Sequence, residues 1–356
     1  MSTQLPEVRE VGSAELVHAF HEQMPTGVTV ADDGRIFVCY PRWGDPVEFT
    51  VAEVRDGREV PYPDAGFNVL DEEHPADCLV SVQSVVVDPD GRLWLLDTGS
   101  TEFGPTVPGG PKLVGVDTGS GRVIQTIRFP RDVALETTYL NDIRFDMRRG
   151  EAGAAFITDS SLSGPSGIVV VDLASGRSWR KLTDHPSTRP VDGFVAIIEG
   201  RPLSSLSVSA DGIAISADGE RLYYCPLSSR RLYSASVEAL YDEDASDDAV
   251  AATVEDLGEK GASDGLETDA DGRIYASNYE HGAILFREPG GDWQALVHRA
   301  DLVFVDTLSV AADGYVYYTV NQVHRQPAFQ GGTDLRERPY ALMRTPVEGD
   351  PVRLRR

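Results

Sequence analysis

Six polar residues recur at one position of a repeated phrase in the sequence, and their types are those of a site that binds a cation or a small-molecule substrate. Five of them lie eight residues before the glycine of a short turn: Thr26, Gln83, Asp211, Asp264 and Asp306. In the remaining copy the turn is one residue longer, and alignment of Asp146 with Asp88 and Asp269 places Asn141 at the same position. Carboxylate and amide oxygens in a cluster suit Ca²⁺, Mg²⁺ or Mn²⁺ rather than Zn²⁺. Without a cation, such carboxyl groups shift their pKa values and hold protons.

These residues predict a metal or substrate site. We expect one divalent cation at Asn141, Asp211, Asp264 and Asp306, with Asp264 or Asp211 as the general base. The alternative is that the six side chains only contact channel water and cap strand ends. The sequence has no Walker A motif and no strand-then-helix dinucleotide fingerprint, so we expect no nucleotide or organic cofactor. The G-x-S-x-G, C-x-x-C and H-E-x-x-H patterns are also missing, which argues against a serine-hydrolase elbow and against zinc.

Further polar and aromatic residues follow the second strand of each phrase or lie in two long connections. The predicted substrate-binding residues are Arg42, Trp43, Gln83, Asp97, Asp159, Asn278, Tyr279, Asn321, His185 and His324. The two histidines fall in the connections 183–210 and 321–339, which are long enough to cover a site. A single loop histidine is more often a surface residue. For Trp43 and Tyr279 the alternative is packing between sheets.

Repeated β-hairpins must position these residues. An apolar run, an Asp-Gly or similar turn and a second apolar run occur at 27–39, 84–96, 142–157, 212–225, 265–276 and 307–318. A second hairpin is visible at 49–63, 113–129, 168–182 and 283–297. Four strands in each of six units predict an all-β, six-bladed β-propeller. The charged stretch 236–250 can hold one helical turn, but we expect a loop there.

The two ends of the predicted ring are expected to meet in one blade. Residues 14–20 (AELVHAF) resemble 294–300 (QALVHRA), a predicted fourth strand. We therefore expect residues 1–22 to complete the last blade and residues 1–356 to form a single propeller domain, because an unpaired edge would expose backbone donors and acceptors. The innermost strand of each blade lines the central channel, so equivalent positions at its start should meet at one mouth.

Composition narrows the class of ligand. The chain has 356 residues, is 41% hydrophobic and carries a formal charge of −25, which argues against binding to nucleic acid or to anionic membranes. The alternative is that this charge only keeps the protein soluble. Cys39 and Cys225 lie in apolar runs typical of buried thiols in a reducing compartment. Neither a signal-peptide pattern nor a long apolar stretch is visible, so we expect a cytoplasmic monomer or weak homo-oligomer that binds a small molecule.

Several phrases, in order, resemble the Yellow/major royal jelly protein family. They are SVQSVVVDPDGRLWLLDTG (81–99), YLNDIRFD (139–146), AFITDS (155–160), GIVVVDLASGRSWR (167–180), DGIAISADGERLYYCPLSSRRLYSASVEAL (211–240) and VDTLSVAADGYVYYT (305–319). The resemblance implies a six-bladed propeller with a small-molecule pocket at one mouth. Some insect members are linked to dopachrome conversion, and some salivary members bind biogenic amines.

A more distant resemblance is to the gluconolactonase/regucalcin propellers. SDGLETDADGRIYASNYEHGAIL (263–285) is similar to their fifth blade, which implies a cation-ligand role for Asp264. Asn141 matches a middle-blade asparagine of that group, and Asp211 stands where a second asparagine would be. Thr26 replaces the first-blade glutamate of those proteins. Asp306, on the neighbouring blade, can supply the missing charge.

Three functions remain open from the sequence. The leading prediction is lactonase-type hydrolysis of a small cyclic substrate, assisted by a divalent cation. The second is tautomerisation of the dopachrome-conversion type, with Trp43 or Tyr279 stacked on the substrate ring. The third is a non-catalytic site for amines, which an acidic funnel and aromatic side chains would attract.

Overall fold

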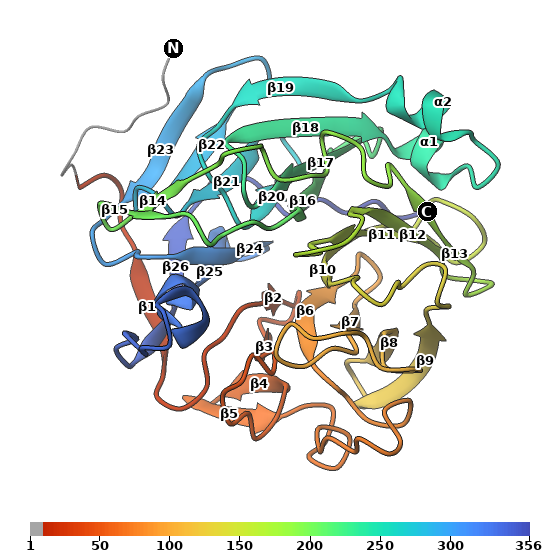
Figure 1. The fold of residues 1–356 in the computed structure, drawn as a ribbon, viewed down its shortest axis with the longest axis horizontal. Coiled ribbons are helices and arrows are strands. Elements are labelled where there is room, and N and C mark those ends of the chain that lie inside the picture. Colours follow the sequence, from red (N-terminus) through yellow and green to blue (C-terminus); the bar gives the residue numbers. More distant parts are fainter. Residues whose placement is uncertain (1–9) are drawn as a thin grey trace.

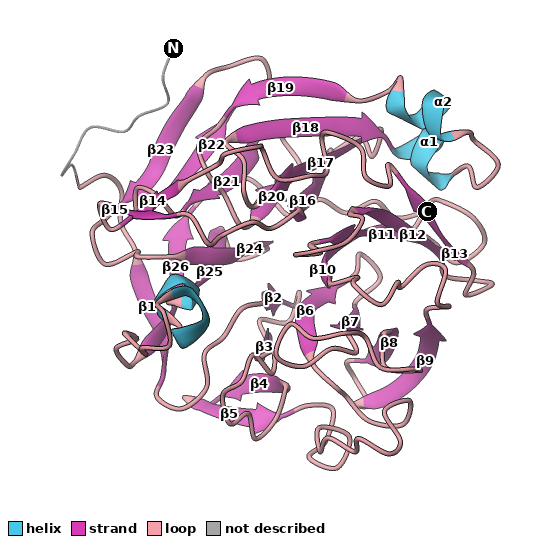
Figure 2. Ribbon diagram, in the orientation of Figure 1, coloured by secondary structure: helices cyan, strands magenta, loops and turns pink. Residues whose placement is uncertain are grey.

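The structure is a computed structural model that describes residues 10–356, and in it six four-stranded antiparallel sheets surround a central channel. Figure 1 shows the sheets as blades of a closed ring, and Figure 2 shows that strands dominate. The all-β, six-bladed propeller predicted from the repeats is confirmed. The degenerate third copy of the phrase, at 142–157, forms a complete blade like the others.

Each blade begins with the strand that lines the channel. Blade 1 contains β2 (Val28–Val30), β3 (Ile36–Cys39), β4 (Val51–Arg55) and β5 (Arg58–Pro61). Blade 2 contains β6 (Val82–Val87), β7 (Arg92–Asp97), β8 (Lys112–Asp117) and β9 (Arg122–Arg128). Blade 3 contains β10 (Leu140–Asp146), β11 (Ala154–Asp159), β12 (Gly167–Asp172) and β13 (Ser178–Lys181).

The other three blades continue around the ring. Blade 4 contains β16 (Ala210–Ile215), β17 (Arg221–Pro226), β18 (Arg231–Ser236) and β19 (Glu255–Glu259). Blade 5 contains β20 (Leu266–Thr268), β21 (Ile274–Asn278), β22 (Ala283–Arg287) and β23 (Trp293–His298). Blade 6 contains β24 (Val305–Ala311), β25 (Tyr315–Val320), β26 (Tyr340–Pro346) and, as its outermost strand, β1 (Glu15–Phe20).

Strand β1 joins the two ends of the ring. It pairs antiparallel with β26, from Glu15 opposite Arg344 to Phe20 opposite Tyr340. Phe20 is fully buried against the core, whereas Leu16 is 61% exposed. The part of the predicted closing segment before residue 10 lies outside the described residues.

The hairpin turns use the chemistry that the repeated phrase predicts. In blade 2 the Asp88 carboxylate accepts hydrogen bonds from the backbone N–H groups of Asp90 and Arg92, at 2.9 and 3.0 Å. Gly91 has a φ of 86°, a left-handed conformation that glycine adopts without a steric penalty. The turn therefore fixes the register of the two strands, and with it the position of the residue eight places before the glycine.

Neighbouring blades are tied together near the channel by threonine hydroxyls. Thr158 of blade 3 donates to the carbonyl of Asp211 in blade 4 at 2.5 Å, and Thr268 of blade 5 donates to the carbonyl of Ile215 at 2.6 Å. Thr319 of blade 6 donates to the carbonyl of Thr26 in blade 1 at 2.5 Å. These bonds satisfy carbonyl groups on innermost strands, which have no further strand to pair with.

Short additional elements lie in the connections. The β14–β15 hairpin (Ala196–Ile198 and Arg201–Leu203) lies in one long connection, and the 3₁₀ helices η1 (Val323–Arg325) and η2 (Pro327–Phe329) lie in the other. The expectation of a loop at 236–250 is wrong, because this stretch forms α1 (Val237–Tyr241) and α2 (Asp247–Ala251). Ser236 and Ser246 accept hydrogen bonds from backbone N–H groups as N-caps, and Val237, Leu240 and Val250 are buried.

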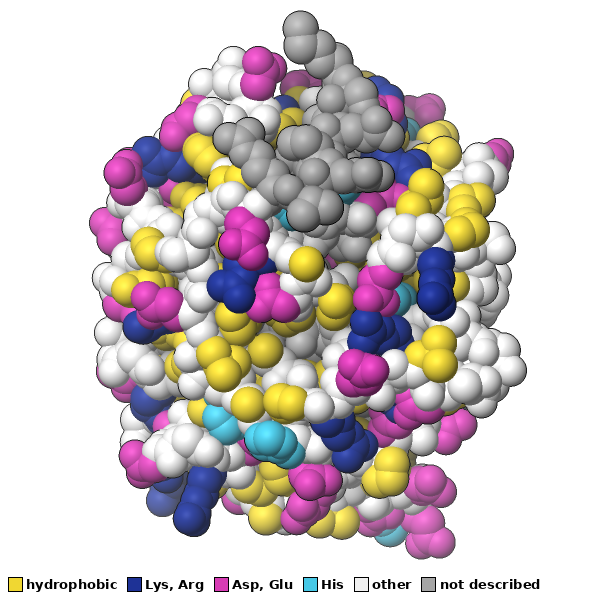
Figure 3. All heavy atoms as spheres, turned by 90° about the vertical axis from the view of Figure 1, so that its left-hand side faces the viewer, with side chains coloured by type: hydrophobic (Ala, Val, Ile, Leu, Met, Phe, Trp, Pro, Cys, Tyr) yellow, Lys and Arg dark blue, Asp and Glu magenta, His cyan; other side chains and the backbone are white. Residues whose placement is uncertain are grey.

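The surface carries both signs of charge. Figure 3 shows acidic and basic side chains interspersed with hydrophobic ones on the side of the ring that bears β1. Cys39, Cys78 and Cys225 are buried free thiols. Among the described residues, no helix has the length and apolar character needed to cross a membrane.

Candidate active site

The repeated polar position forms one wall of a pocket at one mouth of the channel. Five of the six predicted residues line it: Gln83, Asn141, Asp211, Asp264 and Asp306. Thr26 is fully buried beside the pocket, and its hydroxyl donates to the carbonyl of Gln83 at 3.3 Å. The pocket is narrow: it leaves about 50 Å³ for the centres of water molecules, and the value of about 500 Å³ for all space not filled by atoms includes open solvent. The equal spacing from the turns is therefore reproduced as proximity in space.

Three aspartates form a hydrogen-bonded group, which we call the carboxylate cluster: Asp211, Asp264 and Asp306. Asp264 is hydrogen-bonded to both of the other carboxyl groups. Asn141 Nδ2 donates to Asp211 Oδ1 at 2.9 Å. Asn321 Nδ2 donates to Asp306 Oδ2 at 2.6 Å. The two amides hold the outer carboxyl groups in place while Asp264 lies between them.

Ser160 completes the contacts of the cluster. Its hydroxyl lies 2.9 Å from Asp211 Oδ2 and 2.8 Å from the carbonyl of Ala210, so it can donate to one of them at a time. Both oxygens of Asp211 therefore have neighbouring donors. Ser160 also lines the pocket, where a ligand can compete for its hydroxyl.

Burial makes this cluster hold protons near neutral pH. It raises the pKa of Asp211 to about 7, with the charge of Asp142 acting in the same direction. It raises the pKa of Asp306 to about 8, with Asp211 as a further cause. The pKa of Asp264 is also well above its usual range, because of burial and because of the charges of Asp306 and Asp211. Hydrogen-bonded carboxyl groups that titrate near pH 7 can act as an acid and a base in the same site.

Three aromatic side chains line the pocket beside the carboxylate cluster and form what we call the aromatic wall: Trp43, Phe103 and Tyr139. Trp43 stacks on Phe103 with ring centroids 5.0 Å apart, and Trp43 Nε1 donates to the Tyr139 hydroxyl at 2.6 Å. That hydroxyl donates in turn to Gln83 Oε1 at 2.9 Å. The wall therefore connects by hydrogen bonds to the polar floor.

The two long connections supply most of the remaining apolar lining: Leu206, Val208, Val323 and Phe329. Leu162 and Leu227 belong to the loops that follow β11 and β17. Glu199, in the turn of the β14–β15 hairpin, accepts a hydrogen bond from Arg325 Nε at 2.9 Å. His324 Nε2 lies 2.9 Å from the same carboxylate. This contact joins the two long connections above the channel mouth.

Three predicted binding residues do not line the pocket. They stabilise the structure around it through hydrogen bonds and buried ion pairs. Arg42 donates to backbone carbonyls, including that of Val80 at 3.0 Å. Asp97 pairs with Lys112 at 2.8 Å and also accepts from the Val80 N–H. Asp159 pairs with Arg180 at 2.9 Å. The sequence signal, a polar residue at the end of the second strand, does not distinguish a ligand contact from a buried ion pair.

Two further predicted residues lie in the protein interior. Tyr279 stacks on Phe304 with centroids 5.0 Å apart, and its hydroxyl donates to the carbonyl of Leu227 at 2.7 Å. Asn278 is fully buried and does not line the pocket. Tyr279 therefore packs between blades, which is the alternative to a ligand contact that the sequence leaves open.

The two predicted histidines also lie beside the pocket rather than in its lining. His185 Nδ1 is 2.8 Å from the Ser187 hydroxyl, and burial lowers the pKa of His185. His324 stacks on Phe304, and burial lowers its pKa as well. Its role in the structure is the contact with Glu199.

The sequence pattern does not mark most of the apolar lining of the pocket. Tyr139 could have been found, because it lies directly before β10 and two residues before Asn141 in the phrase YLND. Phe103 belongs to the loop after β7, where it adopts a φ of 55°. Nothing in the local pattern marks this phenylalanine as a pocket residue.

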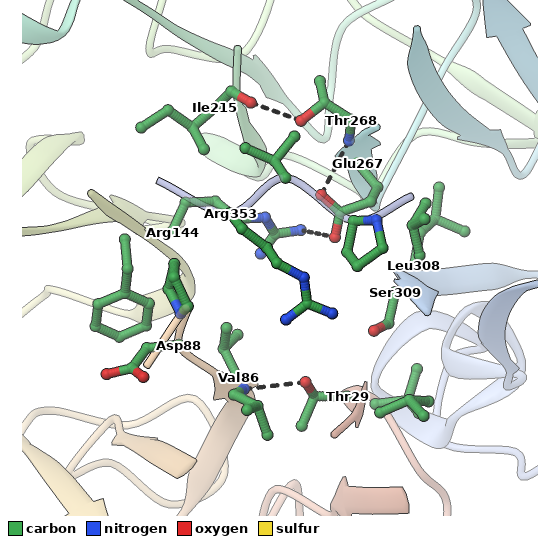
Figure 4. Close-up of a pocket in the computed structure, with 18 of the residues that line it drawn as sticks. Thr29, Val86, Asp88, Arg144, Ile215, Glu267, Thr268, Leu308, Ser309 and Arg353 are labelled. Atoms are coloured by element: carbon green, nitrogen blue, oxygen red, sulfur yellow. Dashed lines mark hydrogen bonds and ion pairs between the residues drawn. The ribbon is translucent and has the colours of Figure 1, made fainter. Parts of the chain in front are cut away.

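A charged layer separates this pocket from a second cavity at the opposite mouth, shown in Figure 4. Arg144 pairs with Asp142 at 3.2 Å and with Glu267 at 3.4 Å. Segment 347–356 passes over this mouth, where Arg353 lines the cavity and donates to Asp32 at 2.6 Å. The carboxylate cluster and the Arg144 layer therefore occupy successive levels of the same channel.

The oxygen donors of the cluster fit a hard cation in chemistry, but their arrangement does not meet the geometry of a metal site. Within residues 10–356, no set of three or more His, Cys, Asp or Glu side chains is arranged to hold a metal ion. The cluster carboxyls are instead hydrogen-bonded to one another. A cation at Asn141, Asp211, Asp264 and Asp306 would have to replace these protons.

Comparison with known proteins gives one family and several similar folds. A sequence model of the major royal jelly protein family matches residues 80–349. Protein yellow of Drosophila melanogaster is 29% identical over 248 residues, which cover 64% of this chain and 43% of that protein. The chain thus spans less than half the length of this relative.

Two solved structures share the fold at low sequence identity. Regucalcin from Agrobacterium tumefaciens, a calcium-binding protein, is 15% identical with a TM-score of 0.57, covering 95% of this chain and 97% of its own. A gluconolactonase from Xanthomonas campestris is 13% identical with a TM-score of 0.54, covering 96% and 98%. At such identity these similarities support the propeller fold alone.

Proposed function

The chain belongs to the major royal jelly protein family, and from this premise we propose that it is a small-molecule enzyme that moves protons at its carboxylate cluster. The reaction that fits best is a tautomerisation or related isomerisation. The observation that supports it is Asp264, hydrogen-bonded between Asp211 and Asp306 beneath an aromatic wall. Such a reaction needs one base and one acid and no nucleophile.

The proposed step conserves protons. An ionised carboxylate of the cluster takes a proton from an acidic C–H, N–H or O–H of the substrate. A neighbouring carboxylic acid returns a proton to another substrate atom, and the electron pair shifts between the two positions. Because Asp264 is hydrogen-bonded to both neighbours, proton transfer within the cluster restores the starting state.

The pocket favours a substrate with a flat, apolar body and a polar edge. Trp43, Phe103 and Tyr139 offer ring faces, while the cluster and Asn141 offer polar atoms only at the floor. A substrate ring stacked on this wall would present its polar edge to the carboxyl groups. Because the apolar lining excludes water, the carboxyl groups of the cluster keep their raised pKa values.

Lactone hydrolysis is the second candidate, and it is the leading prediction from the sequence alone. It is supported by the fold shared with a gluconolactonase and by the all-oxygen donor set at the cluster. In this candidate Asn141, Asp211, Asp264 and Asp306 hold a divalent cation, which would polarise the lactone carbonyl. The cluster would then be ionised rather than protonated.

Binding of amines without turnover is the third candidate. Three carboxyl groups beside aromatic faces would hold a cationic ring compound in place of their protons. For any of the three we propose a cytoplasmic monomer or weak homo-oligomer. The buried free thiols favour the cytoplasmic location.

One panel of ligands separates the candidates. We would measure dopachrome conversion by absorbance, hydrolysis of glucono-δ-lactone by acid release, and binding of dopamine by calorimetry, each with and without EDTA. The proposal expects conversion of an enolisable ring compound that resists EDTA and is lost in Asp264→Asn. Lactone hydrolysis that EDTA abolishes would establish the second candidate. Amine binding without any turnover would establish the third.

The matched control for Asp264→Asn is Asp146→Asn. Asp146 is also a buried, hydrogen-bonded aspartate, but it pairs with Arg148 at 2.9 Å at the other end of β10, outside the pocket lining. Its replacement should lower stability while the folded fraction keeps its activity. Equal loss of activity in both variants would contradict a specific role for the cluster.

A further inference from the structure

The pocket above the carboxylate cluster is too narrow for the ring compound that the proposed reaction needs. It leaves about 50 Å³ for the centres of water molecules, whereas an apolar cavity that admits benzene measures about 150 Å³. The structure therefore shows a closed form of the site, and a substrate ring enters only after part of the lining moves. The part that moves should be one that the blades do not hold.

Much of the lining belongs to the blades or is bonded to them. Asn141 and Asp211 lie on the innermost strands β10 and β16. Val208 precedes β16, and its backbone N–H donates to the Ser228 hydroxyl at 2.9 Å while its carbonyl accepts from the Ser228 N–H at 3.1 Å. Such residues can move only if hydrogen bonds of a blade or its loops break.

Phe329 is held differently, and it separates the pocket from a larger outer cavity. It lies in the short 3₁₀ helix η2, where its backbone N–H donates to the carbonyl of Gln326 at 3.0 Å within the same connection. Its side chain lines both the pocket and the outer cavity. The outer cavity leaves about 620 Å³ by the same measure. Displacement of one phenyl ring would therefore join the narrow pocket to a space that can hold a ring compound.

The walls of the outer cavity are the two long connections. One wall is the β14–β15 hairpin, whose strands pair only with each other within residues 10–356 and lie in front of the blades in Figure 1. A two-stranded hairpin is only marginally stable by itself in water. Its base is tied to blade 5, where the Ile197 N–H donates to Glu280 at 2.8 Å. The opposite wall is connection 321–339, which folds on itself: Gln322 Nε2 donates to the carbonyl of Glu337 at 2.6 Å.

One carboxylate fastens the tip of the hairpin to the opposite wall. Glu199 accepts a hydrogen bond from Arg325 Nε at 2.9 Å, contacts Arg325 Nη2 and lies 2.9 Å from His324 Nε2. We call this contact the clasp. Glu199 has a φ of 53°, a conformation that residues other than glycine rarely adopt without compensating contacts. The clasp therefore closes the outer cavity where its two walls meet.

We propose that the outer cavity is the entrance to the substrate site, that the Phe329 ring is the gate between this cavity and the pocket, and that the Glu199 clasp keeps the entrance closed. A ring compound occupies the outer cavity, displaces the Phe329 side chain and then stacks on the aromatic wall. The alternative entrance is beside Leu162, which also lines the pocket and is 39% exposed. The inference rests on the proposed function for its ligand, a ring compound, but access to the pocket can be measured without turnover.

The first experiment measures access with a thiol placed in the pocket. Val208→Cys introduces this thiol with little change of side-chain volume. The three cysteines of the chain are buried, and their labelling in the unsubstituted protein gives the background. Labelling with 4,4′-dithiodipyridine, a neutral reagent built of two rings, reports access for a ring compound. Methyl methanethiosulfonate is the small, non-aromatic comparison.

Two substitutions in the Val208→Cys protein test the gate and the clasp. Phe329→Ala should raise the rate of labelling by the ring reagent about tenfold or more, because this rate follows the population of the open form. The rate with the small reagent should rise less. Glu199→Gln keeps the size of the side chain but removes its charge, and should raise the ring-reagent rate severalfold. An unchanged rate in either variant would overturn the proposal.

Each test variant has a matched control. Leu335 lines the outer cavity but not the pocket, so Leu335→Ala should keep the rate of the Val208→Cys protein. Glu288 accepts a hydrogen bond from Arg273 at 2.7 Å between two turns of blade 5, so Glu288→Gln should also keep it. Equal acceleration in the controls would overturn the proposal. Acceleration in Leu162→Ala that exceeds that in Phe329→Ala would place the entrance on the other side and would also overturn it.

The second experiment separates a gate from a binding contact. Glu199 lines the outer cavity and not the pocket. In Glu199→Gln the association and dissociation rate constants of catechol, read by stopped-flow tryptophan fluorescence, should therefore rise by the same factor at nearly constant Kd. A rise of the dissociation rate constant alone would make Glu199 a ligand contact and contradict the clasp.

The entrance and the enzyme proposal fail separately. If labelling responds to both variants but no ring compound is converted, the enzyme proposal fails and the entrance stands. If conversion occurs and labelling does not respond, the entrance fails and the enzyme proposal stands. Should Val208→Cys fail to fold, Leu206→Cys supplies another thiol in the same lining and decides the question.

Discussion

At the residue scale, the carboxylate cluster makes the folded chain bind protons more tightly than the unfolded chain. An aspartate in an unfolded chain titrates near pH 3.9, whereas burial raises the pKa of Asp211 to about 7 and of Asp306 to about 8 in the folded protein. The stabilisation from these groups is therefore fully present below pH 4 and is lost as the pH rises towards 8.

This linkage gives a measurable prediction. The free energy of unfolding of the native chain should fall between pH 5 and pH 8 by an amount that Asp211→Asn and Asp306→Asn reduce, on the order of 2 kcal/mol for each. Urea titrations at the two pH values measure it. Asp90→Asn, at a largely exposed turn residue, is the control and should keep the native slope. A cluster variant with the native slope would contradict the raised proton affinity.

The aromatic residues Trp43 and Tyr279 should respond in opposite ways. Trp43→Ala removes a ring that lines the pocket, so ligand affinity should fall about tenfold or more with a small change in melting temperature. Tyr279→Phe leaves the buried carbonyl of Leu227 without its donor and should cost about 1–3 kcal/mol of stability at unchanged affinity. Calorimetry of ligand binding and thermal melts check both. Weaker binding in Tyr279→Phe would place this residue in the site after all.

Single-residue chemistry was only partly predictable from the sequence. The ring positions could be found because a fixed offset from the turns becomes a fixed height in the channel. Asp97 and Asp159 stand at an equally regular place, yet their charges are neutralised by Lys112 and Arg180. Those cations lie elsewhere in the sequence, so the local pattern shows the carboxylates without their partners.

At the scale of elements, hairpins were predictable and the cover of the pocket was not. Alternating residues and Asp-Gly turns are local signals, and the strands follow them even in the degenerate copy at 142–157. The β14–β15 hairpin and the 3₁₀ helices are positioned by contacts such as Glu199 with His324, between residues more than a hundred positions apart. Such contacts leave no periodic signal.

The closing strand β1 provides a test with an internal control. Phe20→Ala removes a fully buried ring from the contact between β1 and the core and should cost about 3–5 kcal/mol. Leu16→Ala changes a side chain that is 61% exposed on the same strand and should cost less than about 0.5 kcal/mol. Denaturant unfolding measures both. Similar small losses in the two variants would mean that β1 contributes little to closing the ring.

At the scale of the whole molecule, the pocket lies in a strongly acidic protein. The formal charge of −25 adds a long-range attraction for cations to the short-range effect of the cluster. The two effects differ in their response to salt. Screening over about 8 Å at physiological ionic strength weakens the long-range field, while charges buried in the pocket are screened far less.

Salt dependence therefore distinguishes a cationic ligand held by the whole surface from a ring compound recognised by the pocket. Affinity for an aromatic amine such as dopamine should fall severalfold between about 20 mM and 300 mM NaCl. Affinity for its neutral analogue catechol should stay nearly constant, because stacking on Trp43 and hydrogen bonds to the cluster do not depend on net charge. Calorimetry with both ligands in both salts gives four affinities. If the amine and the analogue bind equally well and both are indifferent to salt, the acidic surface contributes nothing to recognition. The amine-binding candidate would then lose its electrostatic basis, and the protonated cluster alone would account for the site.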